Sequence, residues 1–90
     1  MPVVRIPTVL RKHTDGAAKV DADGATVGEV FSSLVAVHPG LGDQLLEDGK
    51  VRGFINVYVE DEDIRYIDGL DSPVEPGDEV AIMPAVAGGS

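Results

Sequence analysis

Glu79-Val80-Ala81-Ile82-Met83-Pro84-Ala85-Val86-Ala87-Gly88-Gly89 is the stretch around which the rest of the chain is organised, with Ser90 as the last residue. Its first half is typical of a strand, because β-branched residues such as Val80 and Ile82 are enriched in strands. Its second half consists of small residues and ends in two glycines. Because glycine has no Cβ, its backbone can enter a narrow channel in conformations closed to other residues. The pattern predicts a strand that presents a slim tail to another protein.

Length and composition predict one small soluble domain. The chain has 90 residues, of which 43% are hydrophobic and 26% charged. A domain of this size buries roughly 60–65% of the surface of its unfolded chain, enough for one core but not for a deep substrate cavity as well. The sequence has no long apolar run and no signal segment at Met1–Arg5, so we expect a cytoplasmic protein without a membrane span.

The charge balance disfavours some partners. Sixteen acidic residues against seven basic ones give a net charge of −9, which opposes binding to a nucleic-acid backbone. It suits attraction to a basic partner surface, or simply a well-solvated surface. The chain has no cysteine, which excludes disulfides, thiolate metal sites and a thiol nucleophile.

The N-terminal third predicts a hairpin. Residues 3–10 form an expected first strand with Val4 and Ile6 facing the core, and Pro7 marks its end or a bulge. Residues 11–16 predict a turn, and residues 17–22 a weak second strand.

The clearest helix begins at a capping box. The Thr26 hydroxyl is placed to accept from the Glu29 amide, while the Glu29 carboxylate reaches back to Thr26. The apolar residues of this helix recur at helical spacing: Val27, Val30, Phe31 and Leu34, with Val37 or His38 as a further member. Pro39-Gly40 should end the helix.

Residues 41–48 predict a second, shorter helix that stops at Gly49.

The C-terminal half predicts more strands. Residues 53–60 form the strongest one, residues 61–63 a turn and residues 64–66 a short return strand, while residues 79–83 form the last strand. Alternation places Ile55, Val57 and Val59 inward, and Phe54, Asn56, Tyr58 and Glu60 outward.

This order of elements predicts an α+β fold in which one main helix crosses a mixed sheet of four to five strands. The first and last strands can pair in parallel at its centre, since the intervening chain supplies the long crossover that parallel pairing needs. That arrangement is the β-grasp, or ubiquitin-like, fold. We expect residues 1–84 to form the domain and residues 85–90 a free tail.

No catalytic constellation is visible. His13 lies in an expected loop and His38 at a helix end, each without a second histidine at metal-binding spacing, so structural or exposed roles are favoured. The acidic run 60–63 lacks the glycine and glutamate of a calcium loop and is better explained as a hairpin turn. We therefore expect no metal, no bound cofactor and no enzymatic activity.

Two features point to partners instead. Outward-facing Phe54 and Tyr58, with Met83 on a neighbouring strand, would form an apolar patch beside the root of the tail, unless another loop covers it. Gly88-Gly89 alone is most often a flexible end. A strand of apolar residues that leads directly into it favours a functional tail.

The tail 83–89, the turn 76–80 and the strand 54–59 resemble the ubiquitin-like sulfur-carrier proteins, which include the thiamine-pathway carrier and the small subunit of molybdopterin synthase. The opening 6–11 and the run 56–63 make the chain most similar to the carrier of the thiocarboxylate route to cysteine. This resemblance implies an E1-like adenylating enzyme that uses Mg-ATP to activate the terminal glycine carboxylate. It also implies a sulfur acceptor enzyme, in the cysteine route a pyridoxal-phosphate (PLP) cysteine synthase acting on O-phosphoserine.

Mapped onto this sequence, the resemblance implies that Gly89 carries the thiocarboxylate and that Ala87 and Gly88 give slim access to the enzyme. Ser90 departs from the family pattern, in which the chain ends at the second glycine. Either a JAMM-type metalloprotease removes Ser90 before activation, or Ser90 is a residue added to the natural sequence. A protein modifier that forms isopeptide bonds and a plain interaction domain remain alternatives.

Overall fold

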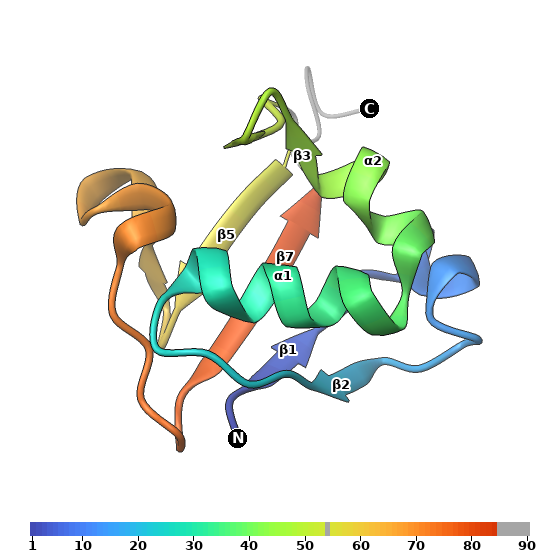
Figure 1. Cartoon of the computed structure of the whole chain (residues 1–90), viewed down its shortest axis with the longest axis horizontal. Coiled ribbons are helices and arrows are strands. Elements are labelled where there is room, and N and C mark those ends of the chain that lie inside the picture. The colour runs from blue at the N-terminus through green and yellow to red at the C-terminus, as the bar shows by residue number, and fades with distance from the viewer. Residues whose placement is uncertain (54, 85–90) are drawn as a thin grey trace.

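The C-terminal strand lies at the centre of the sheet. The computed structural model describes residues 1–53 and 55–84. Its main sheet has five strands in the order β2-β1-β7-β5-β6 (Figure 1). β7 pairs in parallel with β1 and antiparallel with β5, which confirms the central parallel pair and the mixed sheet. The strands are β1 (Val3–Arg5), β2 (Lys19–Asp21), β5 (Ile55–Val59), β6 (Glu62–Asp63) and β7 (Glu79–Pro84).

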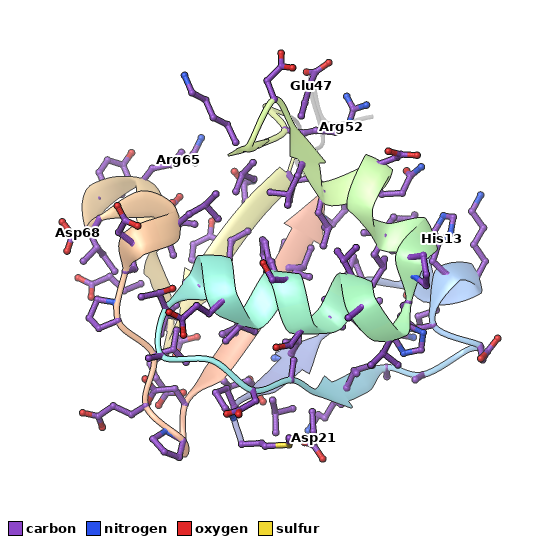
Figure 2. All side chains as sticks on the ribbon, viewed as in Figure 1. His13, Asp21, Glu47, Arg52, Arg65 and Asp68 are labelled. Carbon is purple, nitrogen blue, oxygen red and sulfur yellow. The ribbon has the colours of Figure 1, made fainter. Side chains whose placement is uncertain are left out.

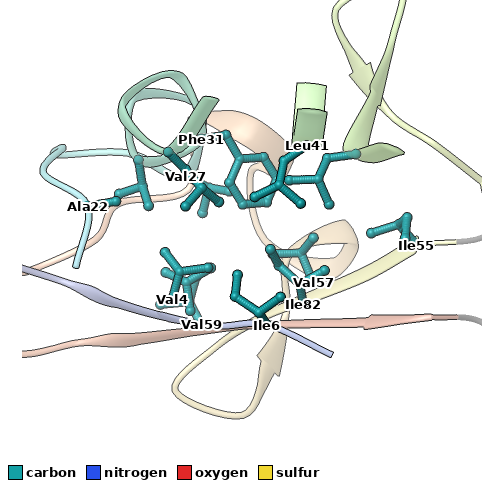
Figure 3. Packing of buried hydrophobic residues seen from close by; sticks show 14 of the residues in the cluster. Val4, Ile6, Ala22, Val27, Phe31, Leu41, Ile55, Val57, Val59 and Ile82 are labelled. Carbon is teal, nitrogen blue, oxygen red and sulfur yellow. The ribbon is translucent and has the colours of Figure 1, made fainter. Parts of the chain in front are cut away.

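One helix, α1 (Val27–Val37), crosses one face of this sheet. The core lies between the helix and the sheet, where Phe31 packs above strand side chains such as Val4 and Val57 (Figure 3). The helix contributes four buried residues, Val27, Val30, Phe31 and Leu34, as its spacing predicted. Val37 does not extend this face, since it is 68% exposed.

The capping box forms with one difference. The Thr26 hydroxyl accepts a hydrogen bond from the Glu29 amide at 3.2 Å, as predicted. The Glu29 carboxylate, however, accepts from the amide of Ala25 at 2.9 Å, one residue before the expected Thr26. Both bonds satisfy amides at a helix start that have no partner within the helix.

The first strand is shorter than predicted. β1 ends at Arg5, and residues beyond Pro7 form the 3-10 helix η1 (Thr8–His13), so the expectation of a strand over 3–10 was wrong in its second half. Pro7 cannot donate to a strand ladder and stands at the start of the new helix. That helix buries Leu10.

The segment after α1 is a short helix followed by a hairpin. It contains η2 (Pro39–Leu41), α2 (Gly42–Leu45), β3 (Leu46–Glu47) and β4 (Lys50–Val51). Asp48 and Gly49 adopt φ values of 53° and 77°, as in the two-residue hairpin turns that need positive φ at both positions. The predicted helix therefore ends three residues early, and Gly49 closes a hairpin.

The turn after β5 also differs from the prediction. Glu60 and Asp61 form it, with φ values of 49° and 70°, and β6 follows at once. Residues 64–66 are the 3-10 helix η3 (Ile64–Tyr66) and not a return strand, because Asp63 caps that turn by accepting from the Arg65 amide at 2.9 Å. A further 3-10 helix, η4 (Gly69–Asp71), completes the fold.

Candidate functional site

The candidate site begins where β7 ends. The last backbone pair of this strand joins Pro84 to Ile55 on β5. Proline has no N–H, so the ladder loses a donor at this position. The predicted tail residues lie outside the described part of the chain: Ala87, Gly88, Gly89 and Ser90. Their roles stay predictions, and the structure locates the point from which they extend.

Alternation along β7 separates an anchoring face from an exposed one. Val80 and Ile82 are 0% and 2% exposed and belong to the core beneath α1. Ala81 and Met83 point to the opposite side of the sheet, and Met83 is 50% exposed. We call this side, which α1 does not cover, the outer face.

Two members of the predicted contact patch are neighbours on the outer face. Met83 lies opposite Asn56, and Tyr58 lies opposite Ala81, so Tyr58 and Met83 are diagonal neighbours on adjacent strands. Tyr58 is half-buried. The third member, Phe54, lies outside the described residues.

A groove of about 410 Å³ runs along the outer face beside β7. Met83 and Pro84 line it at the root of the tail, and exposed Val9 of η1 lines it opposite. Its cationic lining residues are Arg5, Arg11 and Lys19. The described residues that line this groove include no carboxylate, although the chain carries sixteen. Sequence reasoning missed the groove, since alternation marks Arg5 as outward but does not place Lys19 beside it.

Ion pairs lie on the main sheet, on the β3–β4 hairpin and at the start of η3. Arg5 lies 3.6 Å from Glu79 on the outer face, and Arg52 lies 3.7 Å from Glu47 on the β3–β4 hairpin (Figure 2). The Arg65 guanidinium donates to Asp63 at 2.8 Å. These hydrogen bonds lower the pKa of Asp63 and raise the pKa of Arg65.

The histidines form no site in the described part of the chain. His13 lies against the segment that contains Gly40, and its buried Nε2 has no hydrogen-bond partner among the described residues. No group of three or more histidine, aspartate or glutamate side chains within residues 1–53 and 55–84 is placed to hold a metal ion. Over the same residues, no helix has the length and apolar character needed to cross a membrane.

Comparison with known proteins finds one family. The model of the ThiS family matches residues 4–89. The sulfur carrier protein CysO of Mycobacterium tuberculosis is 47% identical over 89 residues, which is 96% of each chain. The small archaeal modifier protein 3 of Haloferax volcanii is 42% identical over 67 residues, or 74% of this chain and 73% of that protein.

The fold is shared as well. The crystal structure of the BexX/CysO complex of Amycolatopsis orientalis contains a chain that matches this one with a TM-score of 0.94 and 46% identity, covering 98% of this chain and 99% of that chain. This structural match covers nearly the whole of both chains and confirms the predicted β-grasp architecture.

Proposed function

The chain belongs to the ThiS family, and from this we propose that it is a sulfur carrier protein, a substrate of other enzymes with no catalytic activity of its own. The observation that carries the proposal is the 47% identity to a protein named as a sulfur carrier over 96% of both chains. An outer face that leads along β7 to the tail supports it.

The chemistry required is the activation of a carboxylate. A carboxylate resists nucleophilic attack, because its charge repels the nucleophile and its oxygen is a poor leaving group. An adenylating enzyme with Mg-ATP would form an acyl-adenylate at the terminus and release pyrophosphate. A sulfide equivalent from a donor would then displace AMP and leave a thiocarboxylate, in which one oxygen of the carboxylate is replaced by sulfur.

Gly89 would carry the thiocarboxylate. The chain from Pro84, the last residue of β7, to the end of Gly89 contains the five residues 85–89, and a fully extended chain of that length spans at most about 18 Å. The enzyme's reactive centre would therefore lie no deeper than that below the surface that contacts the sheet. Ala87 and Gly88 would suit a narrow channel because their side chains are small or absent.

Ser90 would have to be removed first. As the sequence stands, the terminal carboxylate belongs to Ser90 and not to a glycine. A JAMM-type metalloprotease would generate the Gly89 carboxylate, and the full-length chain would be inactive until it is trimmed.

The pathway that would receive the sulfur is cysteine biosynthesis. The 47% identity to CysO supports this route, in which a PLP-dependent cysteine synthase would accept the sulfide. Molybdopterin and thiamine synthesis use related carriers and are the alternatives. The solved BexX/CysO complex supports a recognition step in which such a carrier binds a partner protein.

The test compares the full-length chain with a form that lacks Ser90. Each is incubated with the adenylating enzyme, Mg-ATP and a sulfur donor, and intact mass spectrometry measures replacement of oxygen by sulfur. We expect the exchange only in the trimmed form, and its loss when Gly89 is also deleted. Exchange in the full-length chain would refute the role of Ser90, and no exchange in either form would refute the carrier function.

A protein modifier is the second candidate, favoured by the 42% identity to a small archaeal modifier protein. Such a protein would join its activated terminus to a lysine amine and not transfer sulfide. Expression of a tagged, trimmed chain would then produce covalent adducts of higher mass that survive denaturation, and the Gly89-deleted form would produce none.

A further inference from the structure

The outer face carries its charges in an ordered sequence along the strands. Nearest the start of β7 lies an acidic row, in which Asp21 is opposite Val3 and Val3 is opposite Glu79. Glu60 completes this row, because its amide donates to the Glu79 carbonyl at 3.1 Å and its carboxylate accepts from the Glu79 amide at 2.9 Å. This acidic row lies at the end of β7 farthest from the tail.

The next row toward the tail is basic where it crosses β2 and β1. Lys19 lies opposite Arg5, and Arg5 lies opposite Ala81. The row continues through Tyr58 to Asp63, whose carboxylate is neutralised by its ion pair with Arg65 at 2.8 Å. Same-face rows are two residues apart along a strand, so this basic row is about 7 Å from the acidic one. Ala81 is the small residue in its middle, and the groove runs past it between the longer side chains.

The third row adjoins the tail and is uncharged. Met83 lies there opposite Asn56, and Val9 and Pro84 add apolar surface to the lining of the groove. Along β1 and β7, going toward the tail, the surface therefore changes from acidic to basic to uncharged, with Met83 as its apolar member.

We propose that this outer face docks on the adenylating enzyme in a single register. The matching protein surface has an apolar contact at the mouth of the channel that takes the tail, and carboxylates about 7 Å farther back, facing Lys19 and Arg5. The inference rests on the proposed function, because it assigns the contact surface of that same reaction.

The local charge here is opposite to that of the whole chain. A net charge of −9 predicts a basic partner surface, whereas the groove offers cations. Within the described part of the chain, Arg5 pairs with Glu79 at 3.6 Å, and the two side chains are 58% and 40% exposed. An exposed pair of this kind contributes little, so Arg5 can exchange it for a carboxylate of the partner.

The acidic row would fix the register. If the partner were displaced by one row away from the tail, its carboxylates would oppose Asp21 and Glu79. Like charges that face each other are unfavourable. A slide in the other direction would place carboxylates against Met83 and away from Lys19 and Arg5, while the Nε of Arg11 already donates to the Ile6 carbonyl. Charge order, and not total charge, therefore sets how far the tail enters the channel.

The test inverts this order at constant net charge. Lys19 and Asp21 are exposed residues on one face of β2, so Lys19→Asp with Asp21→Lys exchanges the two signs. The matched control exchanges Glu47 and Lys50, a facing pair on the β3–β4 hairpin. The substrate is the trimmed chain with the adenylating enzyme, Mg-ATP and a saturating sulfur donor that displaces AMP from the acyl-adenylate, and the steady-state rate of pyrophosphate release gives KM and kcat.

We expect the β2 exchange to raise KM about tenfold with kcat within twofold of wild type, and to lose most of this effect at 1 M salt, where the Debye length is about 3 Å. The hairpin exchange should change KM less than twofold. Unchanged KM in the β2 exchange, or an equal rise in the control, would overturn the proposal.

Folding of both exchange variants is checked by circular dichroism. If the β2 exchange does not fold, Lys19→Gln compared with Lys50→Gln gives the same readout, with a rise in KM of about threefold expected for Lys19→Gln alone and no rise overturning the proposal. Absence of turnover with the trimmed wild-type chain would refute the proposed function itself, and this inference with it.

Discussion

Ile82 and Met83 are consecutive residues of β7 with opposite roles, and substituting each by alanine separates anchoring of the strand from contact with the partner. Ile82 is 2% exposed and packs in the core, whereas Met83 is 50% exposed on the outer face. Ile82→Ala removes three buried carbons and leaves a cavity, which costs about 3 kcal/mol. The whole domain is stabilised by only about 5–13 kcal/mol at ordinary values per residue.

The two alanine variants should change different quantities, one the thermal stability and the other the KM for adenylation. Ile82→Ala should lower Tm by about 15 °C in a domain of this size, and below its own Tm should keep the wild-type KM for adenylation. Met83→Ala should change the free energy of unfolding by about 0.5 kcal/mol or less and raise KM severalfold. Thermal unfolding followed by circular dichroism and pyrophosphate release measure the two effects. If Met83→Ala destabilises as strongly as Ile82→Ala, the division of β7 into two faces is wrong.

Two further predictions concern the fold. A Cβ on Gly24 would lie 2.5 Å from the Val30 backbone nitrogen, so Gly24→Ala should cost about 2 kcal/mol, whereas Gly77→Ala, with nothing within 4 Å, should be near neutral in urea unfolding. Arg65 lowers the pKa of Asp63, so the stability that this pair adds is present above the ordinary carboxyl pKa and is lost as pH falls through the lowered value. The stability difference between wild type and Asp63→Asn should accordingly shrink between pH 5 and pH 2, and a difference that grows on acidification would contradict this.

The features that sequence reasoning located correctly depend on local patterns. The helix was predictable because Thr26 and Glu29 have capping spacing and the apolar residues after them recur every three or four positions. The buried face of β5 was predictable from simple alternation. The tail stays a prediction, because Gly88-Gly89 lies outside the described residues.

The failures arose where two local signals competed or where register was needed. Asp48-Gly49 is a hairpin signal, but the helical spacing before it favoured one continuous helix. The short strand after β5 was misplaced because Glu60 and Asp61 form a turn in left-handed geometry, which is uncommon for residues other than glycine. The basic row was not predicted, because the expected hairpin of the first two strands had no assigned register, and it is the register that places Lys19 opposite Arg5.

The position of β7 explains how a chain of this size anchors its last strand. A terminal strand at the edge of a sheet has one partner and can peel away, whereas β7 is bonded to β1 on one side and β5 on the other. Its inward residues Val80 and Ile82 are fixed in the core, so a pull on the tail must break two ladders and expose apolar surface together. Pro84, the last described residue of β7, contributes no donor to the ladder. The position of this strand is thus set by hydrogen bonding on both sides, and the surface around it is set by strand register.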